Sequence, residues 1–150
     1  MGIHKKDHRD NSTLVPTSTY IGIDPGTRTG MAIVKDGIYI AVHTGDILDI
    51  FDKVMPYIGS CTILIENPNL RNYFGNTGRE VLQGAGSIKR DFAIWETFID
   101  RYCIPTIEVA PASIGRSFDN EVFFKKVTGW QGRTSKHARD AAKLVYRNTQ

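Results

Sequence analysis

The fold of this chain is decided by the stretch Ile21-Gly-Ile-Asp-Pro-Gly-Thr-Arg-Thr-Gly-Met-Ala-Ile-Val34. Two apolar runs typical of strands flank a tight glycine turn, and Asp24 stands where the first run ends. Glycine keeps the backbone of such a turn uncluttered by side chains. A carboxylate beside open backbone at the edge of a sheet indicates an active site, which the rest of the sequence must then support.

Length and composition point to one soluble globular domain. The 150 residues are enough to bury most of the surface that the unfolded chain exposes. Apolar residues make up 41% and charged residues 23%, which excludes a disordered or fibrous protein. The net charge is only +3, so a nucleic-acid partner would require the positive charge to gather on one face.

Cysteine usage and hydropathy bear on the cellular setting. Cys61 and Cys103 lie in apolar runs, and we predict buried free thiols in a reducing compartment rather than a disulfide. No apolar run approaches the roughly 18 residues that cross a bilayer, and no signal-peptide pattern opens the chain. We expect a soluble intracellular protein of the cytoplasm or nucleoid, with a host cell or an organelle matrix left open, and no membrane partner.

The N-terminal segment differs in character from the rest. Residues 1–18 are mostly polar and have no periodicity, so we predict a flexible tail, followed by one domain over residues 19–150. His4 and His8 have the spacing of a helical metal pair, but a solvated basic tail is the better interpretation.

Five strands are predicted, at Thr19–Asp24, Met31–Asp36, Ile38–Val42, Cys61–Glu66 and Thr106–Ala110. Asp36-Gly37 between apolar runs is a strong hairpin signal, so the first three strands form an antiparallel meander. The last two are almost continuously apolar, which is typical of strands covered on both faces. The pattern predicts an α/β fold.

Helices are predicted at Asp46–Ile58, Gly78–Tyr102, Pro111–Ile114 and Asp119–Val127, and from Thr134 or Ser135 to Tyr146. The long helix over residues 78–102 is apolar on more than one face and needs two surfaces to cover it. One is its own sheet. We expect the other to be a second copy of the protein.

Four side chains are the candidates for catalysis: Asp24, Glu66, His137 and Asp140. If the strands that end at Asp24 and Glu66 are parallel neighbours, both carboxylates emerge at the edge where active sites of open α/β sheets lie. His137 and Asp140 are three residues apart and share a helix face. Each has an ordinary structural interpretation by itself, such as a turn aspartate or a surface histidine. Their joint placement favours function.

Gathered acids repel one another, and the pKa of each rises unless cations neutralise them. Oxygen-rich sites of this kind suit Mg²⁺ or Mn²⁺. Two such ions about 4 Å apart can activate a water and stabilise the leaving oxygen of a phosphodiester. We expect Asp24 to bridge them.

A basic stripe lies beside the acids on the last helix. A period of about 100° per residue places its members together on an exposed face, where a polyanionic substrate would be attracted. A solvated surface is the ordinary alternative. The stripe comprises Lys136, Arg139, Lys143 and Arg147, extended upstream by Lys125, Lys126 and Arg133. Arg28 and Arg71 complete the basic candidates for DNA binding.

The chain resembles the RuvC family of Holliday-junction resolvases, in the RNase H-like superfamily, over roughly residues 19–147. The matching stretches are Ile21-Gly-Ile-Asp-Pro-Gly-Thr-Arg-Thr-Gly30, Ile63-Leu-Ile-Glu-Asn67, Gln83-Gly-Ala-Gly86 and His137-Ala-Arg-Asp-Ala-Ala142. The resemblance implies a mixed five-stranded sheet flanked by helices and a homodimer formed partly through the long helix. It also implies Mg²⁺-dependent nicking of two like-polarity strands of a four-way DNA junction, with two ions per site and Mn²⁺ as a substitute.

Carried over position by position, the resemblance makes Asp24, Glu66, His137 and Asp140 the metal-binding catalytic set. Family members carry Asp or His at the position of His137. The family places an aromatic residue that works at the opened junction centre in the loop after Glu66. Tyr73 or Phe74 would do this by stacking on an unpaired base, with core packing open for either.

Three other functions stay open at this point. The same fold serves nucleases for forks, flaps or RNA–DNA hybrids. Ile21–Thr27 also looks like the first phosphate motif of actin-like and sugar-kinase ATPases, which use two domains and a longer chain. A junction-binding protein without catalysis would be expected to have lost an acid, and none is missing here.

Overall fold

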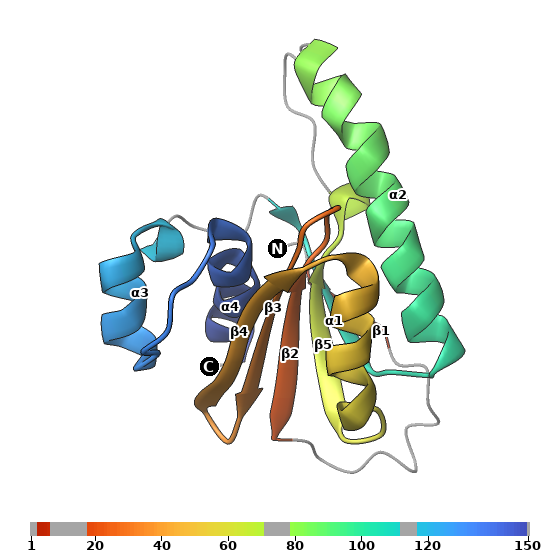
Figure 1. The fold of residues 1–150 in the computed structure, drawn as a ribbon. Coiled ribbons are helices and arrows are strands. Elements are labelled where there is room, and N and C mark those ends of the chain that lie inside the picture. Colours follow the sequence, from red (N-terminus) through yellow and green to blue (C-terminus); the bar gives the residue numbers. More distant parts are fainter. Residues whose placement is uncertain (1–2, 7–17, 71–78, 112–116, 150) are drawn as a thin grey trace.

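The computed structural model describes residues 3–6, 18–70, 79–111 and 117–149. A six-stranded mixed sheet in the order β1-β6-β5-β2-β3-β4 separates two helical layers (Figure 1). The strands are β1 Ile3–Lys6, β2 Thr19–Asp24, β3 Thr29–Lys35, β4 Ile38–Gly45, β5 Cys61–Glu66 and β6 Thr106–Val109. The helices are α1 Ile47–Val54, α2 Arg79–Arg101, α3 Glu121–Thr128 and α4 Lys136–Asn148. Short 3-10 turns cover Met55–Tyr57, Pro68–Leu70 and Ser117–Asp119.

The predicted α/β topology is confirmed. Strands β2, β3 and β4 form an antiparallel meander, and β2 pairs in parallel with β5, which pairs in parallel with β6. Asp36 and Gly37 both have positive φ, 52° and 80°, because a two-residue hairpin turn that matches the strand twist requires it. The parallel pairing of β2 with β5 brings the ends of these two strands to one edge of the sheet.

The N-terminal segment departs from the predicted tail. Ile3–Lys6 form β1, which pairs antiparallel with β6 and places His4 opposite Glu108. The unpaired backbone N–H and C=O groups of an edge strand can pair with any extended segment, whatever its side chains. The polar composition of the N-terminal segment therefore did not reveal its pairing with β6. His4 lies in a strand, where the helical spacing to His8 does not apply, and His8 falls outside the described residues.

Helices α1 and α2 cover one face of the sheet. Ile50 and Val54 of α1 are buried against the strands together with Trp95 of α2. The ring of Phe51 stacks on Phe98 at a centroid distance of 4.3 Å and meets Trp95 edge-on at 4.6 Å. This aromatic cluster joins the two helices over the sheet.

Helix α4 covers the opposite face at unusually close range. Gly22 on β2 and Gly30 on β3 lie directly beneath the helix backbone. A Cβ atom at Gly22 would collide with the Ala141 carbonyl, and one at Gly30 would collide with the backbone of His137 and Ala138. The two glycines therefore determine how closely α4 approaches the sheet.

One smaller expectation comes out differently. Cys61 is buried as predicted, whereas Cys103 is exposed. The long helix ends at Arg101, and Cys103 lies in the turn that follows, with a positive φ of 52°. An apolar run at a helix end thus did not imply burial.

Among the described residues, no helix is both long enough and apolar enough to cross a membrane.

The close seating of α4 makes a direct prediction. Replacing Gly30 by alanine should lower the free energy of unfolding by about 1–3 kcal/mol or more, because the added methyl meets backbone that cannot rotate away. Gly86→Ala is the matched control, since a Cβ there has no atom within 4 Å and alanine favours a helix. Urea denaturation of both variants measures the effect. A Gly30→Ala protein as stable as the parent would contradict it.

Candidate active site

The four predicted catalytic side chains line one cleft at the carboxyl end of the central strands. The cleft has a volume of about 340 Å³. Asp24 ends β2 and Glu66 ends β5, while His137 and Asp140 lie on the first turns of α4. The remaining lining residues are Pro25, Gly26, Thr27, Pro68, Ser87, Ile88 and Asp91. The structure therefore brings together the whole predicted set.

The N-terminus of α4 is fixed over the cleft by its cap. Ser135 has extended backbone and accepts a hydrogen bond from the Ala138 amide at 3.1 Å, as expected of an N-cap serine. The Ser135 hydroxyl is also hydrogen-bonded to the Thr44 hydroxyl of β4. These contacts tie the helix start to the sheet, and they thereby fix the positions of His137 and Asp140 in the turns that follow.

Asp24 is a desolvated carboxylate. Its side chain is 16% exposed, and its Oδ2 lies 3.0 Å from Nδ1 of His137. Burial raises the pKa of Asp24 from 3.8 to about 6, the hydrogen bond with His137 opposes this, and the charge of Asp140 adds to the increase. The cleft is thus a place where a negative charge is costly and a cation would be favourable.

Asp140 is held by two lysines of its own helix. Nζ of Lys136 lies 3.0 Å from Oδ2 of Asp140, and Nζ of Lys143 lies 3.7 Å from Oδ1. The hydrogen bond to Asp140 raises the pKa of Lys136, so the ammonium form persists. Basic groups of the chain itself therefore neutralise this acid.

The carboxylates of the cleft suit Mg²⁺ or Mn²⁺, because these ions prefer oxygen ligands. In this arrangement, however, Asp24 is bound to His137 and Asp140 to Lys136. Within the described part of the chain, no three His, Cys, Asp or Glu side chains converge closely enough to hold one metal ion. The residues fit a metal by type and place, while their side chains are paired with one another.

Eight of the ten predicted DNA-binding residues fall into three groups. Arg28, Lys126, Arg133 and Lys136 are exposed or partly exposed. Lys125 is half-buried and forms an ion pair with Glu121 at 3.1 Å. Arg71, Tyr73 and Phe74 lie outside the described residues.

The interpretation of α4 as carrying an exposed stripe is wrong for Arg139 and Lys143. The guanidinium of Arg139 donates to the carbonyls of Phe118, Asp119 and Thr134 and pairs with Glu121, so it fastens the segment around α3 to α4. Lys143 is 3% exposed, because five consecutive residues of α4, 141–145, are enclosed by the surrounding structure. A helical wheel cannot show such enclosure.

Three residues of α2 in the cleft were not predicted: Ser87, Ile88 and Asp91. Asp91 is 3% exposed. The sequence did hold a signal, since Asp91 is three residues from Ile88 and adjacent to Phe92 within the apolar pattern of the helix. A carboxylate at such a position is unusual enough to be examined as functional.

Comparison with known proteins supports the fold. No protein-family model matches the chain, and no curated protein matches it in sequence. Among solved structures, it is similar to T. thermophilus RuvC in complex with a Holliday junction substrate, with a TM-score of 0.58 and 11% sequence identity. The similarity covers 86% of this chain and 94% of that chain. The fold is therefore RNase H-like, as in RuvC.

The raised pKa of Asp24 predicts how stability depends on pH. An acid whose pKa is higher in the folded state stabilises the fold below its unfolded pKa, and this contribution is lost as pH rises through about 6. In metal-free buffer, Asp24→Asn should therefore exceed the parent in unfolding free energy by up to about 3 kcal/mol at pH 8 and match it near pH 3.5. Denaturant titrations across this range test it, with the exposed Asp52→Asn as control. An Asp24→Asn protein less stable than the parent at pH 8 would refute the electrostatic interpretation.

Proposed function

We propose that this protein is a divalent-metal-dependent endonuclease that resolves four-way DNA junctions by paired symmetric nicks. The observation that carries the proposal is the single cleft in which Asp24, Glu66, His137 and Asp140 meet at the carboxyl end of the sheet. The RNase H-like fold supports it, as does the structural similarity to T. thermophilus RuvC in complex with a Holliday junction substrate. The order of the four motifs along the chain supports it as well.

In this proposal Asp24, Glu66, His137 and Asp140 hold two Mg²⁺ ions, with Mn²⁺ as a substitute. When bound, the ions supply an activated water and stabilise the leaving oxygen of the phosphodiester. The carboxylate of Asp24 is largely desolvated, and a nearby cation would therefore stabilise its charged form. His137 orients Asp24 through their hydrogen bond.

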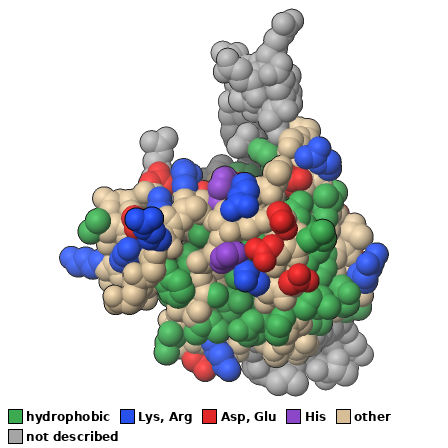
Figure 2. Space-filling view, in the orientation of Figure 1, with side chains coloured by type: hydrophobic (Ala, Val, Ile, Leu, Met, Phe, Trp, Pro, Cys, Tyr) green, Lys and Arg blue, Asp and Glu red, His purple; other side chains and the backbone are tan. Residues whose placement is uncertain are grey.

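The substrate side of the cleft must also accept a polyanion. Lys136 reaches out from the N-terminus of α4 with its side chain 65% exposed, directly beside Asp140. Figure 2 shows Lys and Arg side chains lying among acidic and histidine side chains on the face of the molecule turned toward the viewer. Lys136, Arg28, Lys126 and Arg133 are the candidates for phosphate contacts. Because such contacts are electrostatic, they should weaken with salt.

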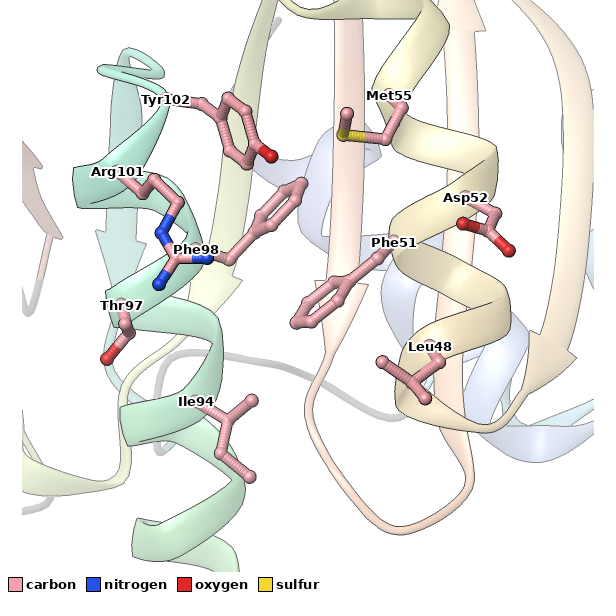
Figure 3. A pocket seen from close by; sticks show the side chains of 9 residues that line it. All are labelled: Leu48, Phe51, Asp52, Met55, Ile94, Thr97, Phe98, Arg101 and Tyr102. Carbon is pink, nitrogen blue, oxygen red and sulfur yellow. The ribbon is translucent and has the colours of Figure 1, made fainter.

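A groove between α1 and α2 is proposed as the seat of a second copy. It has a volume of about 470 Å³ and is lined by apolar side chains from both helices (Figure 3). Leu48 is 72% exposed, Met55 42% and Ile94 38%. Apolar side chains gathered on one exposed face favour association, and a two-fold dimer would present two clefts to the two strands of a junction.

Cleavage of a synthetic four-way junction tests the activity. The parent with Mg²⁺ should give paired nicks at symmetric positions, and Asp24→Asn should reduce the rate at least about 100-fold, because it removes a proposed metal ligand. Asp100→Asn, at an exposed position of α2 that lines neither the cleft nor the groove, is the matched control. Strand-resolved products distinguish the substrate class. Faster cutting of forks, flaps or RNA–DNA hybrids than of junctions would replace the resolvase assignment, and full activity of Asp24→Asn would reject the catalytic site.

Association through the groove makes a separate prediction. Ile94→Glu or Leu48→Glu should convert a dimer to a monomer, because either places a charge in an apolar contact. Sedimentation equilibrium measures the mass, and Val122→Glu, at a 78% exposed position on α3, is the control. A monomeric parent, or a dimer that tolerates both changes, would show that this groove does not join two copies.

A further inference from the structure

We propose that Asp91 is a fifth acidic residue of the cleft and helps to hold the divalent cation from the α2 side, an inference that rests on the proposed metal-dependent function. The four residues predicted from sequence come from two strand ends and from α4. Asp91 comes from α2, on the opposite face of the sheet (Figure 1). The cleft is thereby acidic on both helical walls.

The position of Asp91 follows from the packing of α2. Phe92 and Trp95 are buried in the core against the strands, at 3% and 0% exposure, and they fix the rotation of the helix. This rotation turns Asp91 inward, and Asp91 lines the cleft together with the exposed Ser87 and Ile88 one turn earlier. The carboxylate is therefore held at the cleft wall by the core of the protein.

The ionic surroundings of Asp91 leave its charge poorly compensated. Its side chain is 4% exposed, and a buried carboxylate is destabilising unless it is paired. In the described part of the chain, the ion pair found for Asp91 is with its neighbour Arg90 at 3.5 Å, and the side chain of Arg90 is 64% exposed. A solvated arginine at that distance is a weak partner for a buried acid.

Two other acids of the cleft have closer partners. Asp24 lies 3.0 Å from His137, and Asp140 lies 3.0 Å from Lys136. Asp91 thus brings an additional negative charge to the cleft without an equally close cation among the described residues. A divalent cation in the cleft would compensate this charge, either in direct contact or through one of its water molecules, which Mg²⁺ usually retains.

Metal binding and stability together test this role. Mn²⁺ titrations of the full chain, followed by electron paramagnetic resonance, should show affinity at least about 10-fold weaker in Asp91→Asn than in the parent. Without metal, the same variant should melt at or above the parent temperature, because it no longer buries a poorly paired charge. Added Mg²⁺ should raise its melting temperature less than that of the parent.

Matched variants separate this role from a structural one. Asp100→Asn removes an exposed charge from the same helix and should leave Mn²⁺ affinity unchanged. If Asp91 served only its ion pair with Arg90, Asp91→Asn and Arg90→Gln would both melt at lower temperatures without metal and would bind Mn²⁺ like the parent. That result would overturn the inference. Asp91→Ser provides a second neutral variant should the asparagine protein not fold.

The outcomes for the parent distinguish the two proposals. A parent that binds Mn²⁺ while Asp91→Asn binds it equally well leaves the proposed nuclease intact and removes Asp91 from its site. A parent without any response to Mg²⁺ or Mn²⁺ rejects the metal-dependent function and the role of Asp91 with it.

Discussion

The contact on which the site depends is the seating of α4 directly on β2 and β3. Gly22 and Gly30 present bare backbone to the helix, and any side chain there would push α4 away from the sheet. At this separation Nδ1 of His137 reaches Oδ2 of Asp24 at 3.0 Å across 113 positions of sequence. The Ser135 N-cap and its hydrogen bond to Thr44 hold the N-terminus of the same helix against β4. The placement of His137 and Asp140 in the cleft is a consequence of backbone packing.

Electrostatics explains how the charged groups of the cleft are paired. Several acids occupy one cleft, and desolvation is the largest cause of the increase that brings the pKa of Asp24 to about 6. The chain reduces this cost with its own basic groups, His137 beside Asp24 and Lys136 beside Asp140. Such pairing offsets part of the repulsion among the acids. A site of this kind stores negative charge that a divalent cation can neutralise.

The fold is shared with T. thermophilus RuvC at 11% identity over most of both chains. So low an identity is compatible with one fold because a sheet needs apolar residues in alternation and small residues beneath a close helix, which many sequences supply. The strand ends, by contrast, accept few residue types if they are to do metal chemistry. In the sequence, the resemblance is carried by short motifs around Asp24, Glu66 and Asp140.

The parallel pairing of β2 and β5 was a hypothesis from the sequence, which the structure confirmed. The sequence by itself determined the meander, the long helix, and the edge at which Asp24 and Glu66 emerge if their strands are parallel neighbours. These follow from local periodicity, turn chemistry and the rule that parallel strands end together. Only the tertiary structure decided the edge pairing of β1, the exposure of Cys103, the enclosure of Lys143, the use of Arg139 as a fastening between α3 and α4, and the entry of Asp91 into the cleft. Each of these depends on what surrounds a residue on all sides, and a one-dimensional period specifies a face of a helix or strand without specifying what covers it.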